Sequence, residues 1–300
     1  MSAKKKILVT GGAGFIGSGL IEQLVKDSAN EVYSLDNYST GSKKNHHPLA
    51  VYTEGDTNDI AKLVKIKPDL IFHLGEYARV EKSFEDMESV WHSNKDGTFA
   101  VLEFARARGA KIVYAGSSTK FGLPAPQGGA QAGDGGLGRD QSPYAWTKAS
   151  NTELVKNYGA WFGLDIAITY FYNVYGPREI STGGFATVIG IFKEKRKAGK
   201  PLSVVSPGTQ TRIFTHVDDI VRGLILVGEK GFGDGYGLGA EEQYSILEIA
   251  KMFGGEILML PARAGNRMTS TIDLSRSRDE LGWRAEKNIK DYIKKFVNTV

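Results

Sequence analysis

The chain contains no cysteine among its 300 residues. Disulfide bonds, zinc sites built on thiolates and cysteine catalysis are therefore excluded. The chain also has no run of about 18 apolar residues, so we expect no transmembrane helix and no membrane partner. The first apolar stretch, "ILVTGG", is too short for a secretory signal and leads directly into glycines. We therefore expect a cytoplasmic protein.

Charge of one sign is not in large excess either. The formal net charge is +4, and no long basic block is present, so nucleic acid is not expected as a partner. We also predict no metal site. Hydrophobic residues make up 41% and charged residues 24% of the chain, which is ordinary for a globular protein. The length suits one large domain, or a large domain with a small one.

The first 170 residues alternate short apolar runs with amphipathic stretches. The runs predict strands at 6–10, 31–35, 50–53, 70–74, 111–115 and 164–170. The stretches predict helices at 14–26, 59–66, 88–108 and 143–162. This alternation predicts an α/β fold, a Rossmann-type doubly wound parallel sheet with helices on both faces.

The remaining residues, 171–300, have a different pattern. It predicts helices at 185–199, 218–228, 245–253, 275–281 and 288–298, and strands at 202–205 and 211–214. We expect a smaller α/β substrate domain at the carboxyl edge of the sheet, with some chain returning to the sheet. The glycine-rich segment 127–138 is either a mobile surface loop or a lid.

A glycine pattern follows the first predicted strand. Gly11, Gly14 and Gly17 recur every three residues and open a helix. Glycine lets the backbone turn tightly and approach a pyrophosphate, whose charge then lies at the helix N-terminus. Asp36 ends the second strand, where a carboxylate binds the ribose hydroxyls and repels a 2′-phosphate. NAD is therefore expected rather than NADP. Asp56 either reaches the adenine or is a turn residue.

A tyrosine and a lysine stand four residues apart in "SPYAWTKAS". Tyr144 and Lys148 therefore project from one face of the helix 143–162. A phenol has a pKa near 10, and a nearby positive charge such as Lys148 is expected to lower it. Ser117 follows the fifth predicted strand in "YAGSSTKFG", and its hydroxyl is expected to share the substrate proton with Tyr144.

The motifs together resemble the extended short-chain dehydrogenase/reductases that act on nucleotide sugars. The matching segments run through nearly the whole chain: "TGGAGFIGS", "LDNYSTG", "HLGEYARV", "NKDGT", "YNVYGP", "TRIFTHVDDI" and "PARAGN". Aligned on Phe121–Gly122, the catalytic hydroxyl of the family is Ser117. Tyr144 and Lys148 then match its base and supporting lysine. Phe121 replaces the usual tyrosine, which we regard as neutral.

The resemblance also implies the ligand contacts, with NAD bound by residues 1–170. The cofactor-binding residues implied are Gly11, Gly14, Phe15, Ile16, Gly17, Asp36, Asn37, Ser39, Thr40, Gly41, Asp56, Thr57, Leu74, Gly75, Tyr77, Asn94, Tyr144, Lys148 and Tyr172. The substrate-binding residues implied are Ser117, Tyr144, Asn173, Val188, Arg212, Arg263 and Ser270. The two arginines resemble the family's diphosphate clamp, since a guanidinium is bidentate and permanently charged. The ligand is then a nucleotide-diphosphate sugar, with a UDP-sugar favoured.

The residues after Ser117 bear on the reaction. Sugar 4,6-dehydratases of the family have Asp-Glu there, and UDP-glucuronate decarboxylases usually keep the Glu. Here the pair is Ser118 and Thr119. Epimerisation at C3 or C5 typically uses a cysteine, which is absent. The set that remains is most similar to that of UDP-glucose 4-epimerases, which invert C4 through a 4-keto sugar. Ser270, where a small residue is expected to admit an N-acetyl group, extends the expected substrates to UDP-N-acetylhexosamines.

Two other functions remain open: a nucleotide-sugar dehydratase or oxidoreductase of the same family, and a non-catalytic NAD-binding regulatory protein. The resemblance also implies a homodimer, in which helices 88–108 and 143–162 form a four-helix bundle. Three residues depart from the family: Glu76 replaces a small or amide residue, Tyr170 an arginine, and Lys120 is unusual. Glu76 and Lys120 either pair across the cleft mouth or read a sugar substituent.

Overall fold

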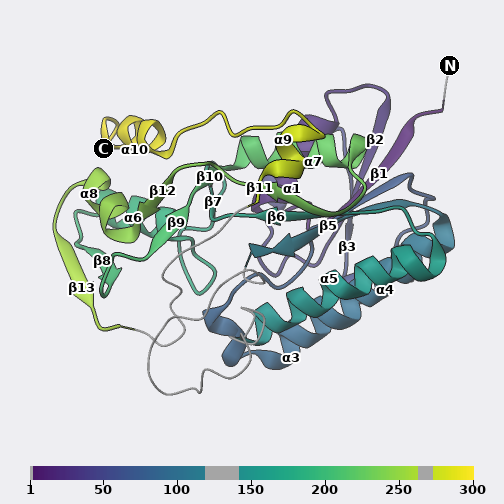
Figure 1. Ribbon diagram of the computed structural model, residues 1–300, viewed down its shortest axis with the longest axis horizontal. Coiled ribbons are helices and arrows are strands. Elements are labelled where there is room, and N and C mark those ends of the chain that lie inside the picture. The colour runs from purple at the N-terminus through teal and green to yellow at the C-terminus, as the bar shows by residue number, and fades with distance from the viewer. Residues whose placement is uncertain (1–2, 119–141, 263–272) are drawn as a thin grey trace.

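The protein is described by a computed structural model that covers residues 3–118, 142–262 and 273–300 (Figure 1). Its centre is a seven-stranded sheet in the order β11–β6–β5–β4–β1–β2–β3, and every neighbouring pair is parallel. The strands are β1 (Lys5–Thr10), β2 (Asn30–Asp36), β3 (Val51–Glu54), β4 (Leu70–His73), β5 (Lys111–Ser117), β6 (Ile166–Phe171) and β11 (Gly233–Leu238). The predicted Rossmann-type fold is confirmed.

Alternate residues of the central strands belong to two hydrophobic clusters, one on each face of the sheet. On β1, Leu8 belongs to one cluster, while Ile7 and Val9 belong to the other. This alternation follows from the two-residue period of a strand. Both faces are covered by helices, which explains why the strand sequences are almost continuously apolar.

The helices form a layer on each side of the sheet (Figure 1). The first layer contains α4 (Gly97–Arg108) and α5 (Pro143–Phe162), and the second contains α1 (Phe15–Leu24) and α7 (Val217–Lys230). A short α2 (Ile60–Leu63) follows β3. Three short 3-10 turns join the elements of this half, η1 (Lys43–Asn45), η2 (Thr57–Asp59) and η3 (Glu81–Phe84).

The long helix predicted at 88–108 is present but not uniform. It consists of α3 (Met87–Val90), a π-helical segment η4 (Trp91–Asp96) and α4. Gly109 ends it in the left-handed conformation, with φ of 64°, as a glycine after a helix often does. The π-helical segment was not predicted, because one extra residue in a single turn does not visibly change the spacing of apolar residues in the sequence.

The second half of the chain builds a third hydrophobic cluster away from the sheet. Its helices are α6 (Val188–Lys197), α8 (Ile246–Phe253) and α10 (Ile289–Val297), with α9 (Ser275–Asp279) beside β11. Three two-stranded ladders complete it, built from β7 (Val174–Tyr175) with β10 (Thr215–His216), β9 (Thr211–Ile213) with β12 (Gln243–Ser245), and β8 (Leu202–Val205) with β13 (Ile257–Leu260). The division of the chain at residue 170 stays a prediction.

Two expectations for this half were wrong or incomplete. Helix α7 was expected at the carboxyl edge, but it lies on the face of the sheet, since Ile220 and Leu224 pack into the same cluster as Leu20 of α1. Strand β11 was not predicted. Its sequence, "GDGYGL", contains three glycines, and it is held in the sheet by pairing with β6.

The described part of the chain contains no helix that is both long and apolar enough to cross a membrane. Within the same residues, no three His, Asp or Glu side chains are grouped as ligands of a metal ion would be.

Tyr170, one of the departures from the family, joins β6 to β11. Its hydroxyl donates to Asp234 over 2.5 Å, and the side chain is buried. We predict that Tyr170→Phe lowers the free energy of unfolding by about 1–2 kcal/mol, because it removes a buried hydrogen bond to a carboxylate. Chemical denaturation measures this change.

The matched control is Tyr33→Phe. The hydroxyl of Tyr33 bonds to Glu31 of the same strand, and that bond is the main cause that raises the pKa of Tyr33 to about 12. The control is expected to change stability by less than about 0.5 kcal/mol. Equal losses in the two variants would contradict the role given to Tyr170.

Candidate active site

The turn between β1 and α1 provides a backbone cradle. Gly11 has φ of 71°, and a Cβ there would lie 2.9 Å from the Cα of Gly75. A Cβ on Gly17 would lie 2.1 Å from the carbonyl oxygen of Gly11. Gly14 is the N-cap of α1, and among the described residues no side chain caps this helix end. Its N–H groups and the helix dipole therefore suit a phosphate.

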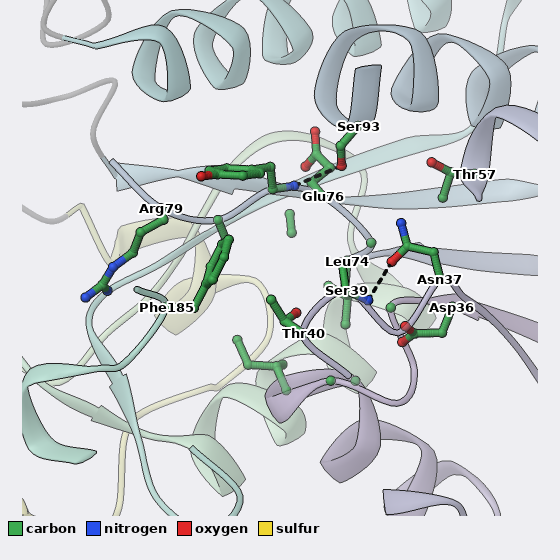
Figure 2. Close-up of a pocket in the computed structure, with 18 of the residues that line it drawn as sticks. Asp36, Asn37, Ser39, Thr40, Thr57, Leu74, Glu76, Arg79, Ser93 and Phe185 are labelled. Carbon is green, nitrogen blue, oxygen red and sulfur yellow. Dashed lines mark hydrogen bonds between the residues drawn. The ribbon is translucent and has the colours of Figure 1, made fainter. Parts of the chain in front are cut away.

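Asp36 ends β2 beside this turn and is buried. Its carboxylate accepts from the backbone N–H of Ala13 and of Tyr38, each over 2.8 Å. Asp56 lies nearby and accepts from the side chain of Asn37 over 3.1 Å. Both carboxylates are thus held by donors. Figure 2 shows Asp36 and Asn37 at the same end of the cavity.

A cavity of about 550 Å³ extends from the glycine turn along the carboxyl edge of the sheet. Most residues predicted to bind the cofactor line it. They are Gly11, Gly14, Phe15, Ile16, Gly17, Asp36, Asn37, Ser39, Thr40, Asp56, Thr57, Leu74, Gly75, Tyr77, Tyr144 and Lys148. Segments from β1, β2, β3, β4 and α5 are therefore brought to one site, as the sheet topology requires.

Three predicted cofactor residues do not line this cavity. Gly41 lies just behind it, where a Cβ would be 2.9 Å from Asp36 Oδ1. Asn94 is fully buried; its amide donates to Thr147 and to the carbonyl of Tyr77. It holds the segment after β4 rather than facing the cavity. Tyr172 is also buried, in the cluster under α4 and α5.

The predicted catalytic residues come together beside the cavity, which Tyr144 and Lys148 line. The Tyr144 hydroxyl donates to Ser117 Oγ over 3.3 Å. Lys148, one turn further along α5, donates to the carboxylate of Glu76 and to the carbonyl of Ala115. The ammonium also lies 4.4 Å from the centre of the Tyr114 ring.

The pKa of Tyr144 is shifted in the direction opposite to that expected. Burial raises it to about 12; the hydrogen bond to Ser117 lowers it, and the charge of Glu76 raises it. The sequence places the positive charge of Lys148 near Tyr144 but does not reveal the partner of that charge. Because Glu76 forms a buried ion pair with Lys148, that charge is largely cancelled at Tyr144.

Glu76 forms an ion pair with Lys148, a contact that neither of the two alternatives for Glu76 and Lys120 included. Lys120 itself lies outside the described residues, as do Thr119, Phe121 and the segment 127–138.

The predicted substrate residues are spread along the second half. Asn173, with φ of 29°, donates its amide to the carbonyl of Ile213 over 2.9 Å. Arg212 lies on β9 and donates to the carbonyl of Thr211. Val188 begins α6. None of these three lines the described cavity. Arg263 and Ser270 lie outside the described residues.

Two loops meet at the end of the cavity opposite Asp36, and the sequence did not predict this contact. Arg79, after β4, donates to the carbonyl of Ala186, before α6. The ring of Phe185 contacts Tyr77 edge-on at 5.2 Å, and Lys82 lies 5.0 Å from its centre. Figure 2 shows Arg79 and Phe185 together at the end of the cavity opposite Asp36.

Several lining residues besides these were missed: Leu35, Gly55, Ala78, Asp86, Ser89, His92, Ser93, Ala115, Gly116, Phe171, Ile180 and Thr187. Most of them lie in loops or at strand ends, where only the fold decides what faces the cavity. For Ala115 and Gly116 the sequence did carry a signal, because they directly precede Ser117 at the end of a predicted strand.

These features fit a dinucleotide. The glycine turn leaves no room for a Cβ at Gly11 or Gly17, the helix end suits a pyrophosphate, and Asp36 stands at the ribose position of such a site.

Comparison with known proteins agrees with this geometry. The sequence model of the NAD dependent epimerase/dehydratase family matches residues 7–239. The chain belongs to this family. It is 31% identical to a putative UDP-glucose 4-epimerase of Methanocaldococcus jannaschii, over 97% of each chain. It is 34% identical to a UDP-N-acetyl-alpha-D-glucosaminuronate decarboxylase of Bacillus cytotoxicus, over 83% of this chain and 79% of the other.

A solved structure extends the likeness to three dimensions. The UDP-glucose 4-epimerase of Thermus thermophilus, in complex with NAD, superposes with a TM-score of 0.85 at 27% identity, over 98% of each chain. As a member of the NAD dependent epimerase/dehydratase family, the protein uses NAD as its cofactor.

The glycine cradle makes NAD binding sensitive to one methyl group. We predict that Gly17→Ala weakens NAD binding at least about tenfold, because its Cβ displaces the carbonyl of Gly11. Isothermal titration with NAD measures this loss. In the control Gly19→Ala, on the same helix, the Cβ meets Val221 at an ordinary 3.4 Å. If both variants bound NAD equally well, the cradle would not depend on Gly17.

Proposed function

We propose that the protein is an NAD-dependent nucleotide-sugar 4-epimerase, which inverts C4 of a UDP-hexose or UDP-N-acetylhexosamine through a transient 4-keto sugar. The observation that carries the proposal is the hydrogen-bonded pair of Tyr144 and Ser117 beside the cavity that fits NAD. This pair can transfer one proton to or from a substrate hydroxyl. 4-Epimerisation requires no other proton transfer from the protein's own acids and bases.

In this mechanism Tyr144 takes the proton of the C4 hydroxyl and later returns it. Ser117 accepts a hydrogen bond from Tyr144 in the ligand-free site, and its hydroxyl orients the substrate oxygen. Lys148 and Asp36 would hold the cofactor riboses, and the glycine turn its pyrophosphate. Bound there, NAD would supply the hydride acceptor and donor for C4.

The acid and base groups that other reactions need are absent from the expected places. Ser118 and Thr119 follow Ser117 in the sequence, where dehydratases and decarboxylases of the family carry carboxylates. Glu76 is the carboxylate whose charge acts on Tyr144, but Lys148 and three further donors already bond its oxygens. The relatives named UDP-glucose 4-epimerase support the same reaction.

The second candidate is a decarboxylase or dehydratase of nucleotide sugars. It is favoured by the relatives named as decarboxylases, which are as similar to the chain as the epimerases are. The reactions differ in mass balance, because an epimerase yields an isomer with no net NADH. A dehydratase product is lighter by water, and a decarboxylase product by carbon dioxide. A non-catalytic NAD-binding regulator would yield no product.

We predict that the protein converts UDP-glucose or UDP-N-acetylglucosamine into the C4 epimer, and that Tyr144→Phe lowers the rate about 10²–10⁴-fold by removing the base. NMR of the products, from a panel of UDP, GDP, CDP and dTDP sugars, checks both statements. The control Tyr158→Phe removes a hydroxyl on the same helix, bonded to Glu103, and is expected to keep the wild-type rate. Equal activity of Tyr144→Phe and wild type would refute the catalytic assignment.

The same panel tests Ser270. Turnover of UDP-glucose without any turnover of UDP-N-acetylglucosamine would contradict the proposed N-acetyl pocket. The diphosphate roles of Arg212 and Arg263, and the substrate contacts of Asn173 and Val188, belong to the proposal as well. So do the division into an NAD domain, 1–170, and a mainly substrate-binding domain, 171–300, and the cytoplasmic location.

We further propose that the protein is a homodimer through α4 and α5. Exposed aromatic rings gather on this helical layer: Trp91 and Trp146 stack at 5.8 Å, and Phe99 and Trp161 are more than half exposed. Figure 1 shows α4 and α5 side by side at the surface of the molecule. Aromatic rings exposed together mark a surface for association.

We predict that Phe99→Glu converts the dimer into a monomer of 32.7 kDa, because it places a charge in the apolar interface. Light scattering measures the mass. Phe232→Glu, which changes an exposed ring outside α4 and α5, is expected to leave the dimer intact. A monomeric wild type would rule out this interface.

A further inference from the structure

Glu76, which the resemblance leaves without a role, lines the cavity and bonds to the buried polar groups beneath it. We propose that Glu76 is a positioning residue: it holds the Lys148 ammonium and cancels its charge, so that Tyr144 stays a protonated phenol in the ligand-free protein. The inference rests on the proposed function only in taking Tyr144 as the base.

The carboxylate of Glu76 is almost fully enclosed and has donors on both oxygens. Its side chain is 4% exposed, and that of Lys148 is 5% exposed. Oε2 accepts from Lys148. Oε1 accepts from Thr98 over 2.9 Å, and from Tyr114 and Asn151 over 3.1 Å each. A buried charge is tolerated when it is paired and its remaining lone pairs are bonded, and both conditions hold here.

A directed chain of hydrogen bonds ends on the same carboxylate. Thr10 Oγ1 accepts from two backbone N–H groups after β4, so its own hydrogen goes to His73 Nδ1, 2.8 Å away. The Nε2–H of His73 then donates to Thr98, which donates to Glu76. Burial lowers the pKa of His73 to about 4, in keeping with a neutral ring in this chain. The chain requires an acceptor at its end, and Oε1 of Glu76 provides it.

Glu76 is therefore an anchor and not an acid or base of the reaction. Burial acts to raise the pKa of its carboxyl, but the charge of Lys148 and the hydrogen bonds from Lys148 and Thr98 lower it overall. Oε1 accepts three hydrogen bonds and Oε2 accepts one from Lys148, so protein donors occupy most of the acceptor capacity of this carboxylate. This separates Glu76 from the carboxylates that dehydratases use.

The ion pair fixes what Lys148 can do for Tyr144. Burial lowers the pKa of Lys148, and the charge of Glu76 and its hydrogen bond to Lys148 oppose that change. With the two charges adjacent, the pair is nearly neutral when seen from Tyr144. Among the residues that the structure describes, the titratable groups that act on the pair or on Tyr144 from neighbouring elements are His73, Lys95 and Tyr114.

The site thus differs from one in which lysine alone lowers the pKa of the tyrosine. Deprotonation of Tyr144 then needs a positive charge that the Glu76–Lys148 pair does not supply. A site of this kind holds its base inactive until a cationic ligand group is present.

The test is the titration of Tyr144 in the full-length protein freed of nucleotide. Tyrosine labelled with ¹³C at Cζ reports ionisation by NMR, and Tyr144→Phe assigns the signal. In the wild type we expect only a few per cent of Tyr144 to be ionised at pH 10.5, because its pKa is about 12. Substantial ionisation of the wild-type residue below pH 9 would overturn the proposal, whatever the variants do.

The isosteric variant Glu76→Gln leaves the Lys148 charge uncompensated. We expect the pKa of Tyr144 to fall by about one unit, so that about a quarter is ionised at pH 10.5. An unchanged or raised pKa would overturn the proposal. The double variant Glu76→Gln/Lys148→Met removes both charges and is expected to restore the wild-type titration. If it titrated like the single variant, the charge of Lys148 would not be the cause.

Tyr114→Phe is the matched control. It removes one hydrogen bond to Glu76 and keeps both charges and the ring beside Lys148. We expect its Tyr144 titration to match the wild type; a shift as large as that of Glu76→Gln would mean that packing, and not charge, controls Tyr144. The titration needs no substrate, so its outcome is independent of whether the protein epimerises any sugar.

Discussion

All strands of the central sheet run in one direction, and this constraint places every group of the candidate site. The carboxyl ends of β1, β2, β4 and β5 lie along one edge, so Thr10, Asp36, His73 and Ser117 end their strands close to the same cavity. The loops that follow these strands carry the glycine turn and the segment with Glu76. Helix α5 then returns from β5 and presents Tyr144 over the edge. A sheet with one reversed strand would separate these groups.

Beneath the cavity, polar side chains are buried because they satisfy one another. Thr10, His73, Thr98 and Glu76 form a chain of hydrogen bonds between β1, β4 and α4, and Lys148 joins it to α5. Such a network is stabilising only when each member has its partner, since an unpaired group would retain the full cost of burial. The same contacts that hold the helical layer on the sheet therefore set the electrostatics at Tyr144.

Across the cavity, the two halves of the chain meet through loops. Arg79 and Lys82, from the first half, contact the segment around Phe185. On the other face of the sheet, α7 and β11 from the second half complete the nucleotide-binding layers. The two halves of the chain thus share the central sheet and its helical layers, although the third hydrophobic cluster is built by the second half.

Local patterns in the sequence were sufficient to predict much of this protein. Apolar runs predicted the first six strands, and Gly109 marked the end of a helix. The spacing of Gly11, Gly14 and Gly17 predicted the dinucleotide-binding turn. These features could be predicted because each of them depends on residues that are close in the sequence. The tertiary structure alone decided the rest. β11 is a strand because β6 pairs with it, and Asn94 faces the protein interior, where its amide donates to Tyr77 and Thr147. Glu76 meets Lys148 across 72 residues of chain, so the charge at Tyr144 follows from a contact that no local pattern records.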